Sequence, residues 1–140
     1  MPLHPSRIKR TVQKVLKREG VQQAHLSLAF VTDRKIRALN RRYLDCDETT
    51  DVLAFDLSDQ TLSKSKKGNI KILEGEVIIC GPTVYNNAKR FGTKPSQELI
   101  LCVIHGILHL LGYDDHSPRE IKRMRDKERE LLTKIGLRDE

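Results

Sequence analysis

The sequence predicts an α+β fold in which one mixed sheet of about four strands is covered by about five helices. Segments with the 3.6-residue apolar repeat of helices are separate from segments that alternate with the two-residue period of strands. The helical segments gather in the second half of the chain, whereas regular α/β alternation would predict a fully parallel sheet. The length of 140 residues suits one domain, so we expect residues 1–140 to form a single unit.

The first half of the chain predicts two helices and two strands. Ile8, Val12 and Val15 follow a helical stripe that ends before Gly20, and Leu26 to Phe30 alternate as in a half-buried strand. A second helix and a second strand follow in the same manner. The expected elements are helix 6–20, strand 26–30, helix 33–43 and strand 53–57.

The second half begins with a polar, lysine-rich stretch at 58–68 that predicts a long loop. Apolar residues at 70–72 and 77–79 predict two more strands, or a hairpin that divides near Glu74-Gly75. Three helices should follow, and Ser117-Pro118-Arg119-Glu120 is a capping box with proline at the first helical position. These helices are expected at 82–91, 95–111 and 118–135.

The charge balance points to an acidic partner. The chain has 26 basic against 19 acidic residues, a net charge of +7, and its basic runs lack the Trp/Phe-rich face of a membrane-surface helix. We therefore expect nucleic acid, and Lys64, Lys66 and Lys67 are candidates for binding its backbone. The longest apolar-rich stretch has thirteen residues, too short to span a bilayer. With no secretory signal visible and three widely spaced cysteines, the sequence predicts a cytoplasmic location.

The chemistry is expected in the helix that should be most apolar. Between Leu99 and Leu111, ten of thirteen residues are Leu, Ile, Val or Cys, and the exceptions are His105, Gly106 and His109. A core disfavours unpaired polar groups, so two imidazoles there need a reason. Residues four apart lie about 40° apart around a helix, one turn above the other. Both rings can therefore face one metal ion.

A third histidine follows in the turn beyond that helix. His116 precedes the expected cap at Ser117, which gives the spacing H-x3-H-x6-H. Three imidazoles would leave the fourth coordination position of a zinc ion open for water or substrate, as in catalytic sites. Asp114 and Asp115 are candidates for orienting the rings, or are simple turn residues. Gly106 either allows close helix packing or clears space beside a ligand.

Four blocks of the chain carry a family pattern: HGILHLLGYD at 105–114, Leu39-Asn40 with Tyr43, TDVLAF at 50–55 and GEVIIC at 75–80. These blocks resemble the YbeY family of bacterial rRNA maturation endoribonucleases. The resemblance implies a metal-dependent α+β hydrolase with three histidine ligands to one Zn²⁺ ion. It also implies a single-stranded RNA substrate, with roles in 16S rRNA 3′-end processing and in ribosome maturation and quality control.

The chain departs from the family pattern at two positions. The family usually has its third histidine at H-x3-H-x5-H, where this chain has Asp115. Either His116 reaches the ion through a longer turn, which we prefer, or Asp115 is a carboxylate ligand. The family commonly has an arginine where Leu44 stands; Arg41 and Arg42 are nearby candidates for handling the phosphate, or are surface charges.

The residues allow metal-assisted hydrolysis of a phosphodiester bond. A cation can lower the pKa of a bound water toward about 7 and polarise a phosphoryl oxygen. The metal-bound water itself, Asp51 or Glu48 could serve in acid–base catalysis. A zinc peptidase would need Glu directly after the first histidine, where this chain has Gly106. A third possibility is a ribosome-binding factor whose metal is only structural.

Overall fold

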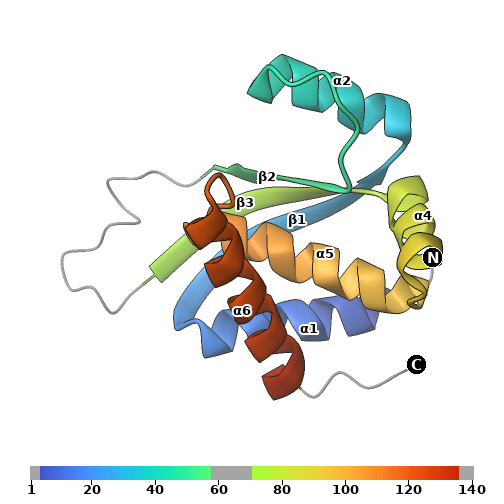
Figure 1. Ribbon diagram of the computed structural model, residues 1–140. Coiled ribbons are helices and arrows are strands. Elements are labelled where there is room, and N and C mark those ends of the chain that lie inside the picture. Colours follow the sequence, from blue (N-terminus) through green and yellow to red (C-terminus); the bar gives the residue numbers. More distant parts are fainter. Residues whose placement is uncertain (1–3, 58–70, 136–140) are drawn as a thin grey trace.

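A computed structural model describes residues 4–57 and 71–135 of the chain (Figure 1). Within these residues, five helices accompany three strands, so the predicted α+β class is confirmed. Helix α1 and strand β1 come first, and three of the four remaining helices follow β3, so the helices gather in the second half of the chain as expected. The elements are α1 (Pro5–Arg18), β1 (Val21–Val31), α2 (Asp33–Leu44), β2 (Val52–Asp56), β3 (Lys71–Cys80), α4 (Gly81–Phe91), α5 (Pro95–Leu110) and α6 (Pro118–Ile135).

The sheet is mixed, as predicted, but it has three described strands rather than four. Its order is β1-β3-β2, with β3 parallel to β1 and antiparallel to β2. The two strands expected at 70–72 and 77–79 form the single strand β3, and Gly75 pairs with Leu26 on one side and Asp56 on the other. The loop expected at 58–68 lies outside the described residues.

Gly75 is inside the strand because of packing rather than because of a turn. A Cβ atom at position 75 would lie 2.7 Å from Cδ1 of Leu110 in α5. The absent side chain therefore makes room for α5 to cross the sheet closely, a role that glycine can have in a strand interior. Sequence alone does not separate this role from a turn, and this explains the wrong strand count.

The helices cover the two faces of the sheet unequally. Figure 1 shows α1, α5 and α6 on one side of the sheet and α2 on the other. The larger hydrophobic core lies on the side of α5, where Val77 and Ile79 pack with Ile104 and Leu108. A smaller cluster on the opposite face joins Ile36 of α2 to Leu53, Ile78 and Cys80.

Helix α5 is the central element of the larger core. Ten of its residues are buried, which fits the apolar run seen in the sequence. Pro95 stands in its first turn, and Gly112 follows the helix with a positive φ of 101°. Among the described residues, no helix is both long and apolar enough to cross a membrane.

The predicted capping box at the start of α6 is present. The backbone N–H of Glu120 donates to Ser117 Oγ at 3.2 Å, and the N–H of Ser117 donates to Glu120 Oε1 at 3.0 Å. The same Glu120 oxygen accepts from the backbone N–H of His116 at 3.1 Å. These bonds fix the short turn between α5 and α6, and this turn carries the acidic residues next to the histidines.

Candidate metal centre

Three side chains converge where α5 ends and α6 begins. His105 Nε2 lies 3.1 Å from His109 Nε2, and each of these atoms lies 3.5 Å from Asp115 Oδ2. All three side chains are partly exposed, at 25% for His105, 26% for His109 and 39% for Asp115. Within the described chain, these residues form a group of metal-ligating type with no fourth His, Cys, Asp or Glu.

The local structure explains why the two histidines meet. They are one helical turn apart on α5, with ring centroids 4.6 Å apart and ring planes at 81°. The turn fixed by the Glu120 capping box brings Asp115 over them from the N-terminal side of α6. The site therefore depends on two rigid helices and a turn with defined hydrogen bonds.

The three donor atoms fit a tetrahedral metal ion. Ligands at about 2.0–2.1 Å from zinc in tetrahedral geometry lie about 3.3–3.4 Å from one another. The observed separations of 3.1, 3.5 and 3.5 Å bracket that value. Two imidazoles and one carboxylate are a set that zinc binds, and such three-ligand sites leave a position for water or substrate.

His105 has a second partner on its other ring nitrogen. Its Nδ1 lies 2.5 Å from Oε2 of Glu128 in α6. Burial lowers the pKa of His105, but the hydrogen bond and the negative charge of Glu128 outweigh it, so the net pKa is raised. Glu128 is not among the site residues predicted from the sequence. The sequence feature that could have pointed to Glu128 is its place as a single acid on the buried stripe of α6, which contains Met124, Leu131 and Ile135.

The structure brings Asp115, and not His116, to the two histidines. His116 is exposed, and its backbone N–H bonds to Glu120. From the sequence, His116 is preferred over Asp115 as the third ligand. In the structure Asp115 lies beside the two histidines instead, because the capping box fixes the backbone at 116 and 117. Asp114 is also exposed and is not part of the group.

The two acid–base candidates occupy different places. The Asp51 carboxylate accepts from the Cys102 thiol, with 3.4 Å between Oδ2 and Sγ, and Cys102 is one turn before His105 on α5. The charge of Asp51 also contributes to the raised pKa of His105. Glu48, in contrast, is exposed, and its backbone carbonyl accepts from the side chain of Asn40. Of these two candidates, Asp51 is the one with a described hydrogen bond to α5, at the residue one turn before His105.

Cys102 is a buried thiol next to the centre rather than a member of it. Burial, followed by the nearby charge of Asp51, raises its pKa far above the usual range. The metal-ligating group does not include it. Its side chain belongs to the larger hydrophobic core, so its role is packing.

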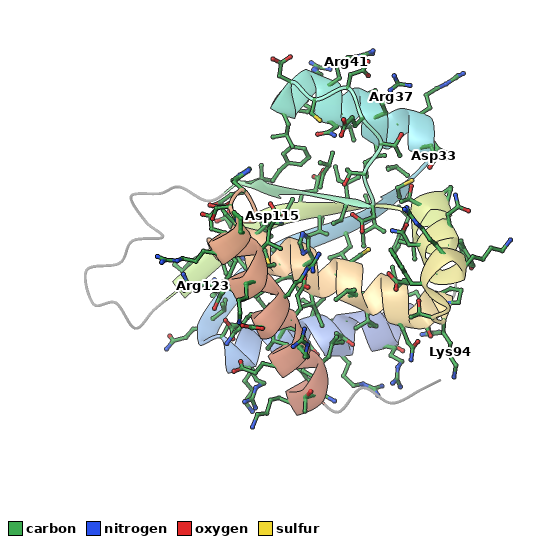
Figure 2. All side chains as sticks on the ribbon, in the orientation of Figure 1. Asp33, Arg37, Arg41, Lys94, Asp115 and Arg123 are labelled. Atoms are coloured by element: carbon green, nitrogen blue, oxygen red, sulfur yellow. The ribbon has the colours of Figure 1, made fainter. Side chains whose placement is uncertain are left out.

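The basic residues predicted to bind the nucleic-acid backbone are not part of the His–His–Asp group. In Figure 2, Arg37 and Arg41 are on α2, above the sheet, whereas Asp115 lies at the start of α6. Arg41 is 3.8 Å from Asp47, and the Arg42 guanidinium lies 5.3 Å from the centre of the Tyr43 ring. Leu44, at the position of the family arginine, is exposed. Lys64, Lys66 and Lys67 lie outside the described residues.

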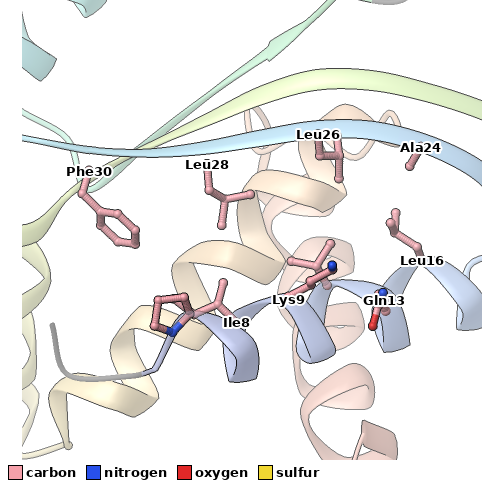
Figure 3. A pocket seen from close by; sticks show the side chains of 10 residues that line it. Ile8, Lys9, Gln13, Leu16, Ala24, Leu26, Leu28 and Phe30 are labelled. Carbon is pink, nitrogen blue, oxygen red and sulfur yellow. The ribbon is translucent and has the colours of Figure 1, made fainter.

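A separate apolar groove lies between α1 and the edge strand β1 (Figure 3). It has a volume of about 440 Å³ and is lined mainly by aliphatic side chains, including Ile8, Leu26 and Leu28. None of the three metal-ligating residues lines it. The groove therefore belongs to the packing of α1 against the sheet and not to the candidate centre.

The α+β fold and the partly exposed His–His–Asp group define an α+β protein with a candidate metal centre that solvent can reach. A family model described as "Endoribonuclease YbeY" matches residues 2–136. The chain belongs to this family, which confirms the resemblance of its sequence blocks.

Individual relatives agree with the family match. The chain is 38% identical over 129 residues to the endoribonuclease YbeY of Pelotomaculum thermopropionicum, covering 91% of this chain and 84% of that protein. It is 37% identical over 138 residues to the endoribonuclease YbeY of Salinibacter ruber, covering 94% and 87%. It also resembles the solution structure of TM1509 from Thermotoga maritima, with a TM-score of 0.57, 27% identity and coverage of 93% and 82%.

Proposed function

We propose that residues 1–140 form one zinc-dependent endoribonuclease domain that cleaves single-stranded RNA. The observation that carries this proposal is the triangle of His105, His109 and Asp115, whose side lengths suit a tetrahedral ion. The partial exposure of all three side chains leaves the ion accessible to substrate. Membership of a family named for endoribonuclease activity supports RNA as the substrate class.

The centre would act on a phosphodiester bond. When bound, zinc would polarise a phosphoryl oxygen and lower the pKa of a water molecule. His105 and His109 would hold the ion as neutral imidazoles, each through Nε2. Of the two acid–base candidates, Asp51 is the one whose carboxylate contacts α5 at Cys102 and whose charge acts on His105, and we assign the proton exchange to it.

Basic residues outside the metal centre would hold the RNA backbone. The net charge of +7 favours binding of a polyanion, and Arg41 and Arg42 on α2 are exposed cations of this kind. Few aromatic side chains are available for base stacking, so weak sequence preference is expected. We infer that the physiological substrate is the 3′ end of 16S rRNA on the small ribosomal subunit in the cytoplasm, in ribosome maturation and quality control.

One set of reactions tests this function. Purified protein is analysed for metal and then incubated with a single-stranded RNA, as wild type, after chelation, and as His109→Ala. The wild type with zinc should cleave RNA, and the chelated sample and the variant should not. His25→Ala removes an exposed histidine on β1 and serves as the matched control. Hydrolysis of peptides but not RNA would support a peptidase, and ribosome binding without cleavage would support a structural metal.

A further inference from the structure

Glu128 is the acidic exception on the buried face of α6. Met124, Leu131 and Ile135 share its helical stripe and are buried. The Glu128 side chain is only 12% exposed. A carboxylate in such a place is costly unless it is paired. Its partner is the imidazole of His105, through Nδ1 at 2.5 Å.

This contact determines which ring nitrogen of His105 is available to bind a metal ion. A neutral imidazole has one N–H donor and one nitrogen with a lone pair. With the proton on Nδ1 and donated to Glu128, the lone pair is on Nε2. That nitrogen faces His109 Nε2 and Asp115 Oδ2. The carboxylate and the ion site are thus on opposite sides of one ring.

Helix α6 is held in place by the residue next to Glu128. Lys127 Nζ lies 2.9 Å from Glu19 Oε2, just after α1, and 2.7 Å from Glu130 Oε2. The Lys127 and Glu19 side chains are 23% and 11% exposed. Consecutive residues of α6 therefore contact two different helices: Lys127 contacts the end of α1, and Glu128 contacts α5. The direction from which Glu128 reaches His105 is fixed by the packing of α6.

We propose that Glu128 is a positioning residue of the metal centre, which holds His105 in the Nδ1–H form and so presents Nε2 to the ion. This inference rests on the proposed function in one respect only, namely that the His105–His109–Asp115 group binds a metal. Orienting carboxylates of this kind strengthen metal binding by fixing ring orientation and raising the basicity of the ligand nitrogen.

The test is zinc affinity, measured by competition with a chromophoric chelator on the full chain. Glu128→Ala should bind zinc about 10–100-fold more weakly than wild type. Glu128→Gln should lose less, because its amide oxygen can still accept from Nδ1–H without the charge. Asp126→Asn removes one exposed negative charge from the same helix, where Asp126 pairs with Lys122, and should bind as wild type.

A second readout follows the proton itself. Long-range proton–nitrogen NMR spectra of the metal-free protein, recorded at a pH where the His105 imidazole is neutral, should give the Nδ1–H form of His105 in wild type and in Glu128→Gln. The Nε2–H form should become populated in Glu128→Ala. Circular dichroism checks that each variant is folded, and Glu128→Gln keeps the test valid if Glu128→Ala does not fold.

The outcomes separate the positioning role from the nuclease function. Folded Glu128 variants with wild-type zinc affinity would overturn the positioning role, even if the wild type cleaves RNA. Weakened zinc binding in Glu128→Ala, in a protein that never cleaves RNA, would support the positioning role and reject the nuclease. A wild type that binds no zinc would overturn both.

Discussion

Gly106 of α5 lies directly against Val77 of β3. A Cβ atom at position 106 would lie 2.8 Å from Val77 Cγ1 and 3.3 Å from Cγ2 of Val52. The sequence left two explanations for this glycine, close packing and clearance beside a ligand. The structure supports close packing, because the missing side chain faces the sheet. The glycine lets α5 approach β2 and β3 while His105 and His109 remain at the surface of the domain.

The substitution Gly106→Ala should therefore destabilise the protein even though alanine favours helices. Overpacking a core costs about 1–3 kcal/mol, and the gain in helix propensity returns up to about 1 kcal/mol. We expect a net loss of about 1–2 kcal/mol in the free energy of unfolding, measured by urea denaturation. Gly81→Ala is the control, because a Cβ there meets nothing within 4 Å.

A compensating change tests the same contact from the other side. Val77→Ala removes two of the three methyl groups that a Cβ at 106 would meet, including the nearest one. The double variant Gly106→Ala with Val77→Ala should be more stable than the sum of the single changes predicts. Strict additivity in urea unfolding would show that the two positions do not meet in this way.

The contacts that the sequence predicted are local, and those that it missed are tertiary. The capping box at Ser117 and Glu120, and the pairing of His105 with His109 across one turn, depend only on helix geometry. The role of Gly75 depends on Leu110, thirty-five positions away in the chain. Sequence spacing contains no information about such a contact, so the sequence predicts a division between two strands near Gly75.

The third metal-ligating residue is also hard to predict from the sequence, although the residues involved are close together in the chain. Asp115 and His116 are neighbours, and both are residue types that bind metals. The choice between them depends on the path of the turn, which hydrogen bonds from the backbone of His116 and Ser117 to Glu120 determine. The contact between Glu128 and His105 is harder still to predict, because only the packing of α6 on α5 brings the two side chains together.

Adjacent substitutions in this turn should have different effects on metal binding. Asp115→Ala should weaken zinc binding by more than the about 10–100-fold expected for Glu128→Ala, since a ligand contributes more than the residue that orients it. His116→Ala should bind zinc as wild type does, because its side chain is exposed and outside the group. Asp114→Ala, an exposed neighbouring carboxylate, is the matched control. Isothermal titration with zinc measures all three, and the reverse ranking of 115 and 116 would assign the ligand to His116.

Removal of the metal should abolish cleavage and leave most of the fold. Among the described residues, the larger hydrophobic core has eighteen buried members, such as Leu108 and Leu131, and none of the three metal-ligating residues. Metal that binds the folded chain would add stability as RT ln(1 + c/Kd), where c is the concentration of free metal, so chelation should lower the melting temperature without unfolding the helices at about 25 °C. Far-ultraviolet circular dichroism before and after chelation measures this. Loss of helical signal on chelation would instead indicate a structural metal.

The ion pair between Lys127 and Glu19 should stabilise the docking of α6 over a wide pH range. Hydrogen bonds to Glu130 and Glu19 outweigh burial and raise the pKa of Lys127. A cation whose pKa is raised by folding contributes stability below its unfolded pKa, about 10.4 for lysine, and loses the contribution as the pH rises above that value.

We therefore expect Lys127→Met to lower the free energy of unfolding at pH 7 by about 1–2 kcal/mol, between the values typical of exposed and buried pairs. The difference from wild type should be constant from pH 6 to about pH 10 and should shrink at higher pH. Lys122→Met, which removes an exposed lysine paired with Asp126 on the same helix, should change stability by less than about 0.5 kcal/mol. Urea unfolding of the three proteins across this pH range decides the matter, because a difference that grows above pH 10 would mean that folding lowers the pKa of Lys127.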